Sequence, residues 1–338
     1  MTITELFHTS TKVLVLLVVF GFSSQVMANK YRVSGPFSQS NLSIYLIHGE
    51  DKIKNQRYLT LSEALQQKKV KVHETSNVNQ LSIENLSKSD HIYIQAGDIV
   101  KGGKQDRVFS TDMILEPQSG KIDIASFCVE QGRWNPRGKE SSKEFHSSTK
   151  KLSSKELRLA ARLKHNQSEV WSEVAKSQQK LGDKVGTDVK SKDSASSLQL
   201  TLENKKLAEK ISAYKKELLP LLRGKKQVIG YAFAINGELN TADVYANQAL
   251  LKKLWPSIID SAATESVGEY DKELQYKNPK AVAVLEWMDN TQKGKQTTRE
   301  IKPGLKQDTV ENETDVRFDT YSGSGKERKL YRQNYIKK

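Results

Sequence analysis

Two strings of polar residues have the types and spacing to bind an anionic group. The first spans residues 95–107 and follows a predicted strand, with Gly102 and Gly103 adjacent to each other. Adjacent glycines accept positive φ angles, so successive backbone N–H groups can point to one side as an anion-binding nest. The same residues also fit a β-hairpin with a glycine turn and solvated charges. The ligand-binding candidates in this string are Lys104, Gln105 and Arg107.

The second string, residues 126–134, ends a predicted buried central strand. Strand alternation places Cys128 and Glu130 on one face. Gly132 permits a sharp bend, after which Arg133 can fold back toward Glu130. Because burying either charge alone is costly, this pair forms either a structural ion pair or the floor of a pocket, with Arg133 as a ligand-binding candidate.

General acid–base chemistry is a second option for the same residues. Glu130 or Asp98 is the candidate acid or base, and Arg133 would stabilise developing negative charge. Cys128 is a weaker candidate, as a nucleophile, because an ordinary thiol pKa of about 8.5 leaves little thiolate at neutral pH. Its apolar neighbours and the nearby Glu130 disfavour the thiolate further, so we prefer a small buried core thiol.

Other polar residues receive structural interpretations. Asp243 follows a predicted two-residue turn and could face a cleft, but a cap or loop role is preferred. Arg328, Lys329 and Arg332 are predicted to lie on a solvated strand face, with no motif for nucleic-acid binding. Residues 135–154 are rich in Ser, Lys and Glu and are predicted to form a surface loop or linker.

The elements that must position these residues indicate an α+β fold. Residues 42–47 have the apolar, β-branched pattern of a strand, and most of the first half reads in short strand-like runs. A short helix begins after Thr60, which forms a capping box with Glu63. The C-terminal half adds amphipathic helices and a β-hairpin over residues 229–245. We therefore expect an antiparallel or mixed sheet in the N-terminal half, with helices and a hairpin in the C-terminal half.

Length and composition bound the class of protein. The 338 residues suffice for one large domain, which we expect over residues 29–338, with a C-terminal helix and hairpin at 278–336. Hydrophobic residues make up 36% and charged residues 28%, which excludes a disordered chain and a polytopic membrane protein. The chain is basic, with a net charge of +14. Its single cysteine and six scattered histidines exclude a disulfide framework and zinc-finger spacing, so we expect no metal and no cofactor.

The N-terminus predicts export. The apolar run at residues 13–22 has the length of a signal-peptide core and about half that of a membrane span. Val26 and Ala28 are small residues at the positions expected before a cleavage site. Residues 1–28 are therefore predicted to be a signal peptide cleaved after Ala28, which leaves a secreted or periplasmic protein without a transmembrane anchor.

Several of these strings together resemble a known family. Gly97-Asp98, residues 103–107 and the Cys-x-Glu-x-Gly-Arg-Trp string at 128–134 are similar to the domain named for its association with ADP-ribosylglycohydrolase and rhodanese-phosphatase proteins. The resemblance runs from about residue 41 to residue 268. It implies no established activity, only a link to ADP-ribose or nucleotide metabolism. The family pattern has Gly-Glu where this chain has Gly97-Asp98, and the shorter carboxylate would shift any contact.

Three functions stay open on the sequence alone. The first is an exported protein that binds a small polar or anionic ligand at the Lys/Gln/Arg and Glu/Arg groups. The second is a hydrolase-type enzyme that acts on a nucleotide- or ADP-ribose-like substrate, with Glu130 and Asp98 as acid and base. The third is an envelope structural protein without a small-molecule site. No nucleic-acid partner is expected, and the oligomeric state is left open.

Overall fold

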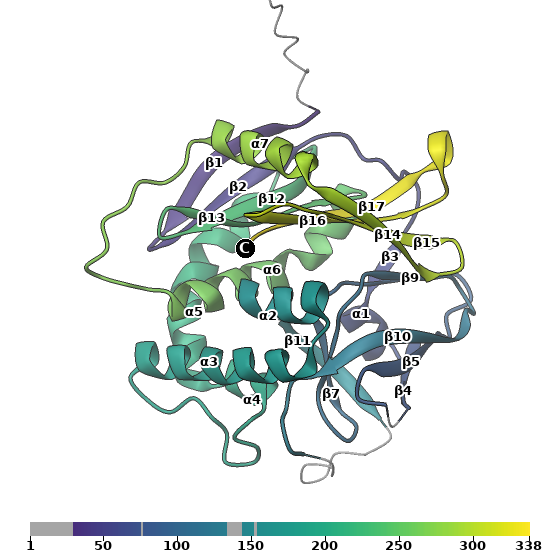
Figure 1. The fold of residues 1–338 in the computed structure, drawn as a ribbon, viewed down its shortest axis with the longest axis horizontal. Coiled ribbons are helices and arrows are strands. Elements are labelled where there is room, and N and C mark those ends of the chain that lie inside the picture. The colour runs from purple at the N-terminus through teal and green to yellow at the C-terminus, as the bar shows by residue number, and fades with distance from the viewer. Residues whose placement is uncertain (1–29, 76, 134–143, 152–153) are drawn as a thin grey trace, which may run out of the picture. The chain divides into compact units, whose positions relative to one another are not determined.

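An eight-stranded antiparallel sheet is the largest element of the fold (Figure 1). Its strand order, β1-β2-β12-β13-β17-β16-β15-β14, pairs the first two strands with strands from the last third of the chain. The computed structural model describes residues 30–75, 77–133, 144–151 and 154–338. The strands of this sheet are β1 (Arg32–Gln39), β2 (Leu42–His48), β12 (Val228–Ile235), β13 (Glu238–Tyr245), β14 (Lys295–Lys302), β15 (Leu305–Glu311), β16 (Asp315–Ser322) and β17 (Lys329–Lys337).

Helices cover both faces of this sheet at β12, which explains why β12 is apolar throughout. Along β12, Tyr231 and Phe233 share one hydrophobic cluster with the helix α6 (Gln248–Gly268). Ala232, on the opposite face, packs in a second cluster with α7 (Ala281–Asn290). A strand with helices on both faces buries every side chain, and each residue of β12 is buried.

A second, six-stranded antiparallel sheet contains both polar strings. Its order is β11-β7-β8-β10-β5-β4, with β10 in the interior as predicted for the strand before Cys128. The third sheet has three strands in the order β3-β6-β9. The strands are β3 (Tyr58–Thr60), β4 (Val70–Glu74), β5 (Gln80–Asn85), β6 (His91–Ile94), β7 (Asp98–Gly102), β8 (Arg107–Phe109), β9 (Met113–Leu115), β10 (Gly120–Cys128) and β11 (Phe145–Lys151).

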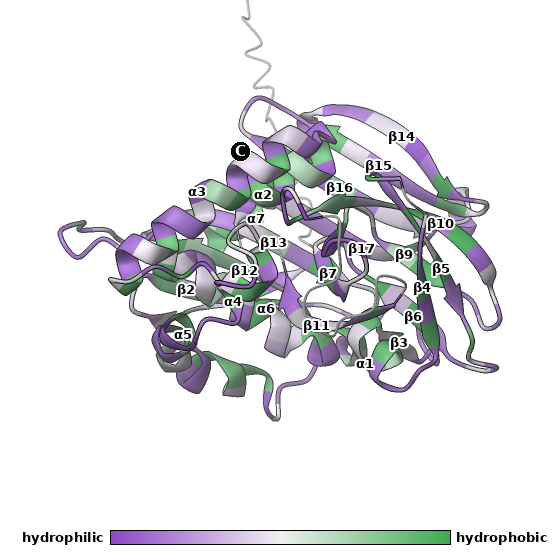
Figure 2. Cartoon of the chain, turned by 90° about the horizontal axis from the view of Figure 1, so that it is seen from below, coloured by the Kyte–Doolittle hydropathy of each residue, from purple (hydrophilic) through white to green (hydrophobic). Residues whose placement is uncertain are grey.

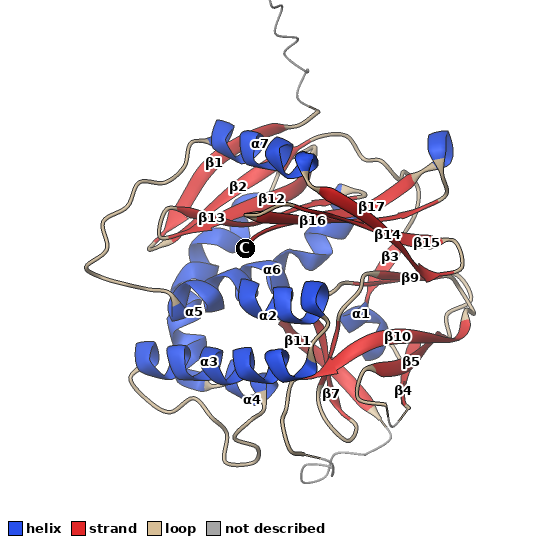
Figure 3. Ribbon diagram, in the orientation of Figure 1, coloured by secondary structure: helices blue, strands red, loops and turns tan. Residues whose placement is uncertain are grey.

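The remaining helices stand between and beside the sheets (Figure 3). The longest of them, α3, buries one apolar stripe and exposes a hydrophilic face, which Figure 2 shows as alternating colours along the helix. A π-helical turn, Ala160–Lys164, directly continues α2. These helices are α1 (Leu61–Gln66), α2 (Lys155–Leu159), α3 (Gln167–Val185), α4 (Leu198–Leu202) and α5 (Lys205–Leu218).

The α+β class and the distribution of strands and helices predicted from sequence are confirmed. The capping box of Thr60 and Glu63 is present at the start of α1. One local prediction is wrong. Residues 135–154 were predicted to be a loop, but 145–151 form β11, whose polar sequence carries no strand alternation because β11 is an edge strand. The predicted C-terminal hairpin forms as the antiparallel pair β16–β17, and two further strands, β14 and β15, extend the large sheet beside it.

The chain divides after Lys30, and residues 31–338 form one compact unit. The predicted signal peptide and its cleavage site at Ala28 lie outside the described residues. Among the described residues, no helix has both the length and the apolar character needed to cross a membrane.

Candidate functional site

The two polar strings meet at the ends of β7, β8 and β10, where they form what we call the strand-end cluster. The guanidinium of Arg107 and the amide oxygen of Gln105 both lie 2.7 Å from Cys128 Sγ. Gln105 Nε2 also donates to the backbone oxygen of Glu130 at 2.9 Å. Arg133 folds back, with its Nε 2.6 Å from Glu130 Oε2. The members of the strand-end cluster are Gln105, Arg107, Cys128, Glu130 and Arg133.

Every polar side chain of the strand-end cluster is bonded to other groups of the protein. Arg107 is fully buried and also contacts Glu74 and the backbone oxygen of Val78. Arg133 donates to the backbone oxygens of Gly102 and Gly103, and its side chain is 10% exposed. This geometry is that of the structural ion pair, one of the two interpretations of the sequence. Ligand binding by this cluster stays a prediction.

The glycine turn forms as a β-hairpin between β7 and β8. Gly102 and Gly103 have φ angles of 117° and 58°, so both adopt the left-handed conformations that glycine favours. The N–H of Gly102 donates to the carboxylate of Asp106 at 3.0 Å, and that of Gly103 donates to the backbone oxygen of Glu144. The two N–H groups therefore bond different acceptors and do not form one anion-binding nest; the acceptor of the first is the chain's own Asp106. Lys104, in the turn itself, is half-buried.

Cys128 is a buried thiol in a hydrogen-bonded position. Burial raises its pKa to about 11, although the nearby charge of Arg107 works in the opposite direction. A thiol with that pKa is almost wholly protonated at neutral pH and is a poor nucleophile. The geometry agrees with the core thiol that the sequence favours.

Asp98 lies apart from the strand-end cluster. It begins β7, whereas Gly102, which contacts the cluster, ends it. Four residues along a strand span roughly 13 Å, so Asp98 lies at the opposite end of β7 from the cluster. Asp98 instead lines a cavity of about 280 Å³ between α1, β11, α5 and α6, which we call the lysine cavity.

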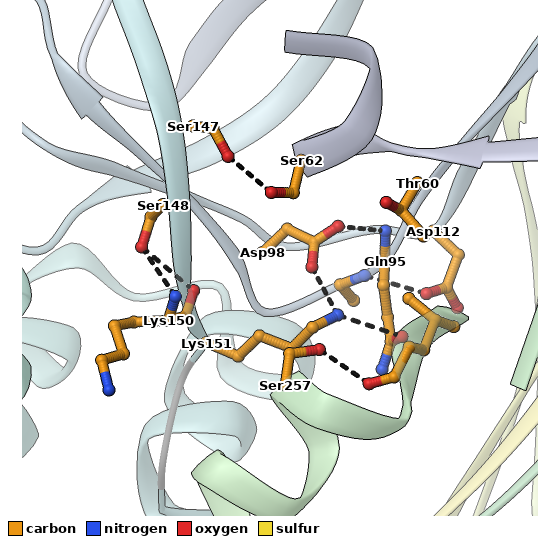
Figure 4. Close-up of polar contacts among 12 residues, drawn as sticks. Thr60, Ser62, Gln95, Asp98, Asp112, Ser147, Ser148, Lys150, Lys151 and Ser257 are labelled. Carbon is orange, nitrogen blue, oxygen red and sulfur yellow. Dashed lines mark hydrogen bonds and ion pairs between the residues drawn. The ribbon is translucent and has the colours of Figure 1, made fainter. Parts of the chain in front are cut away.

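The lysine cavity gathers charges from five different elements, α1, β7, β11, α5 and α6. Its lining includes four lysines and three carboxylates, which gives a net charge of 4 − 3 = +1. Five hydroxyl groups also line it, and two of them, from Ser62 and Ser147, lie 2.6 Å apart (Figure 4). The lysines are Lys150, Lys151, Lys215 and Lys253, and the carboxylates are Glu63, Asp98 and Asp260.

Each carboxylate of the cavity is paired with lysine. Lys151 Nζ lies 2.5 Å from Asp98 Oδ1, and Figure 4 shows this pair beside Gln95. Lys253 lies 3.0 Å from Glu63. Burial favours the neutral form of Glu63, but hydrogen bonds from Thr60 and Lys253 outweigh it and lower the pKa of this carboxyl.

A buried set of ion pairs lies near Lys151, on the interior side of the cavity. We call it the central ion network. Asp112 bonds Arg162 at 2.6 Å and Arg332 at 2.8 Å. Arg332 also bonds Asp243 at 2.8 Å. None of the four side chains is more than 4% exposed. The members of the central ion network are Asp112, Arg162, Asp243 and Arg332.

The electrostatics of this network hold its charges in place. Burial alone would raise the pKa of Asp112, but the charges of Arg162 and Arg332 keep it well below its usual range. Burial together with the Asp243 charge raises the pKa values of Tyr231 and Tyr245 well above normal, so both phenols stay protonated. Tyr231 donates to Asp243 at 2.6 Å.

Gln95 joins the central ion network to the lysine cavity. Its side-chain oxygen accepts from Lys151 at 3.2 Å and from Tyr245 at 3.4 Å. Its backbone N–H donates to Asp98 at 2.8 Å. The Lys151–Asp98 pair is therefore oriented from the protein side by a residue that also contacts Tyr245, whose hydroxyl lies 3.5 Å from Asp243 of the network.

The structure corrects the interpretation of two residues. Asp243 has neither a cap nor a loop role, because it lies buried on β13 within the central ion network. Arg332 is 3% exposed and does not lie on a solvated face, since it points between the sheets to two aspartates. Alternation alone cannot show this, because both faces of that sheet are covered and either face can bury a charge that has a partner.

The sequence interpretation missed most of the lysine cavity. Lys150 and Lys151 belong to the segment predicted to be a loop, and Lys215 and Lys253 look like the solvated faces of amphipathic helices. The one available signal was the capping box, since Thr60 and Glu63 both line the cavity. Asp98 is the one predicted site residue among the cavity's lining.

Comparison with known proteins gives a family but no activity. No curated protein and no solved structure matches the chain significantly. A family model, described as the ARG and Rhodanese-Phosphatase-superfamily-associated Protein domain, matches residues 30–337. This match is wider than the stretch from about 41 to 268 on which the sequence resemblance rests, and it includes strands β14–β17. The chain belongs to the family of the ARG and Rhodanese-Phosphatase-superfamily-associated Protein domain.

Proposed function

We propose that this domain binds a small polar ligand with an anionic group in the lysine cavity. The observation that carries the proposal is the convergence of four lysines from β11, α5 and α6 on a cavity that holds only three carboxylates. Its volume of about 280 Å³ lies just below the range of roughly 300–1,000 Å³ typical of ligand pockets, so it suits a ligand at the small end of that range. The hydroxyl groups on its wall can bond the polar body of such a ligand.

The proposal moves the binding site predicted from sequence. The basic residues of the strand-end cluster are bonded to the protein itself, whereas the lysines of the cavity face a space that a guest can enter. Water and dissolved ions can reach Lys215 and Lys253, whose side chains are 38% and 36% exposed. A ligand can therefore exchange at this site without breaking the buried core.

A thermal-melting screen with nucleotides, ADP-ribose and anionic saccharides tests the proposal. A ligand at about 100 times its dissociation constant adds roughly 2.7 kcal/mol of stability, which such a screen detects. Ser257→Phe places an aromatic ring in the cavity and should abolish the shift. Ser212→Phe is the matched control, because Ser212 is also a helical serine bonded to the backbone three residues earlier but does not line the cavity.

The expected result is a ligand that stabilises the wild type and Ser212→Phe but not Ser257→Phe. Two results would overturn the proposal: no compound of the panel stabilises the wild type, or Ser257→Phe responds as fully as the wild type. The first of these outcomes would favour the alternative of an envelope structural protein without a small-molecule site.

A hydrolase is the second candidate, and one observation favours it. Asp98 and Asp260 both line the lysine cavity, so two carboxylates could serve as acid and base on one substrate. Glu130 is not the partner of Asp98 in this version, because it lies at the other end of β7. Product formation from nucleotide- or ADP-ribose-like substrates, followed by chromatography, should disappear in Asp98→Asn. Binding without turnover would leave only the first proposal.

Export remains part of the proposal. Its support is the apolar run at residues 13–22 followed by small residues up to Ala28. The intact mass of the protein recovered from a cell that exports it should correspond to a chain that begins at Asn29. A mass that includes residues 1–28 would contradict cleavage at this site.

A further inference from the structure

Two of the cavity's lysines share a single carboxylate. Lys150 Nζ lies 2.8 Å from Asp260 Oδ2, and Lys215 Nζ lies 3.0 Å from Asp260 Oδ1. The three residues come from β11, α5 and α6, so the tertiary structure alone brings them together. Within the part of the chain that the structure describes, Asp260 is the one carboxylate in contact with either ammonium. We call these residues the Lys150–Asp260–Lys215 triad.

The excess positive charge of the cavity is located in this triad. The other two lysines each have a carboxylate, Lys151 with Asp98 and Lys253 with Glu63. One carboxylate offset by two ammonium groups leaves a net charge of +1 at the triad. That arrangement attracts a second anion, and the Coulomb energy is larger in a partly enclosed cavity than in open water.

The burial of the triad decreases from one side to the other. The side chains of Asp260 and Lys150 are 11% and 16% exposed, while that of Lys215 is 38% exposed. An anion arriving from solvent therefore meets Lys215 first and can then reach Lys150. Each ammonium has three N–H donors and directs one of them to Asp260.

We propose that the triad is the subsite for the ligand's anionic group, a carboxylate or a phosphate, and that Asp260 occupies this subsite as an internal competitor. The inference rests on the proposed function, because it specifies which end of the lysine cavity recognises charge. Both kinds of anion present oxygens that ammonium groups bind as point charges. The hydroxyls of Ser148 and Ser257 line the same cavity beside the triad.

If Asp260 competes with the ligand, its removal should raise the affinity for anions. The removal of a purely structural carboxylate would not raise that affinity. Asp260→Asn removes the internal anion and leaves two ammonium groups close together. The variant should therefore bind anions more tightly while it becomes less stable in their absence. A structural carboxylate without a binding role would give the loss of stability alone.

Equilibrium titration with inorganic phosphate and, separately, acetate tests this inference and distinguishes the two anion classes. Relative to the wild type, Asp260→Asn should bind the preferred anion about 10-fold more tightly, and Lys215→Met about 10-fold more weakly. Lys253→Met is the matched control, because it removes a lysine of the same cavity whose charge is offset by Glu63, and it should change affinity little. Lys215→Met should fold normally, since its side chain is the most exposed of the triad.

Equal anion affinity in the wild type, Asp260→Asn and Lys215→Met would overturn the inference. So would an equal loss of affinity in Lys215→Met and Lys253→Met, because it would place the anion elsewhere in the cavity. The two proposals can fail separately. If a ligand from the melting screen binds the wild type and Lys215→Met alike, the triad inference fails while binding in the cavity stands. If Asp260→Asn gains affinity but Ser257→Phe leaves ligand binding intact, the cavity proposal fails by itself.

Discussion

The central ion network and the lysine cavity both pair carboxylates with basic side chains, but the surroundings of these pairs differ. In the network, aspartates bond arginines with side chains no more than 4% exposed. In the cavity, lysines bond carboxylates and some side chains are more than a third exposed. Water can replace a lost partner in the cavity but not in the network. The network therefore governs stability, and the cavity is suited to exchange one anion for another.

The choice of cation fits this division. The planar guanidinium of Arg332 reaches Asp112 and Asp243 at fixed angles, and the guanidinium of Arg162 bonds Asp112 and Asn334. Arginine is suited to such fixed, multiple hydrogen bonds. Lysine supplies a compact charge on a flexible stem, which can follow a ligand as it enters. We therefore expect substitutions in the central ion network to have large effects on stability and substitutions in the lysine cavity to have small effects.

The largest effect is expected from the central ion network. Asp112→Asn keeps the shape of the side chain but leaves two buried arginines short of negative charge, so the free energy of unfolding should fall by about 3–5 kcal/mol. Urea unfolding followed by circular dichroism measures the loss. The control is Glu203→Gln, whose partner Lys101 and own side chain are both partly exposed. A stability of Asp112→Asn equal to that of the control would remove the distinction between the two regions.

A smaller loss of stability is expected in the strand-end cluster. It tests whether this cluster behaves like the central ion network or like the lysine cavity. Arg133→Ala removes the guanidinium that lies 2.6 Å from the fully buried carboxylate of Glu130 and should cost about 2 kcal/mol. The loss should be the same with and without an anionic ligand, and Glu130→Gln should behave similarly. A variant of normal stability with weakened ligand binding would instead place the cluster with the lysine cavity.

A still smaller effect is expected for single charges in the cavity. Lys253→Met breaks a partly exposed pair with Glu63, so its effect on stability should be no more than about 1 kcal/mol. The melting temperature at low and high salt measures it, and added salt should narrow the difference from the wild type. A loss as large as that of Asp112→Asn would show that the cavity charges are structural.

The smallest effect is a dependence on pH near neutrality. Burial, together with the charges of Arg299 and Arg162, lowers the pKa of His165 below its usual value. The unfolded chain therefore binds a proton more readily than the folded one, so stability is complete above about pH 6.5 and declines as the pH falls below that value. Melting temperatures between pH 5 and about pH 8 should show this slope, and His165→Gln should flatten it. An unchanged slope would assign the effect to another group, such as His48, whose pKa burial also lowers.

The strand-end cluster was largely predictable because its residues are close along the chain or in adjacent strands. The spacing of Glu130 and Arg133 around Gly132 implies the pair that forms at 2.6 Å. The adjacent glycines imply the positive φ angles that the hairpin contains. The hydrogen bond from Gly102 to Asp106 was not predictable, because it depends on side-chain positions that only the folded turn fixes.

The lysine cavity was not predictable from local patterns. Lys150, Lys215 and Lys253 occupy an edge strand and two helix surfaces, where lysine is the ordinary solvated residue. Nothing in their spacing relates positions that are 38 or more residues apart, as Lys215 and Lys253 are. Asp98 was identified as a candidate because its carboxyl group, in the polar string at 95–107, can act as an acid or base, but its partner Lys151 was not.

The sequence by itself determined the α+β class, the capping box of α1, the interior position of β10 and the pairing of Glu130 with Arg133, because these depend on periodicity and short spacing. The tertiary structure alone decided which charges are buried in the central ion network and which line a cavity. The physical reason is that the burial of a charged side chain depends on whether a counter-charge lies beside it and whether water reaches it. Strands and helices that are distant in the sequence determine both.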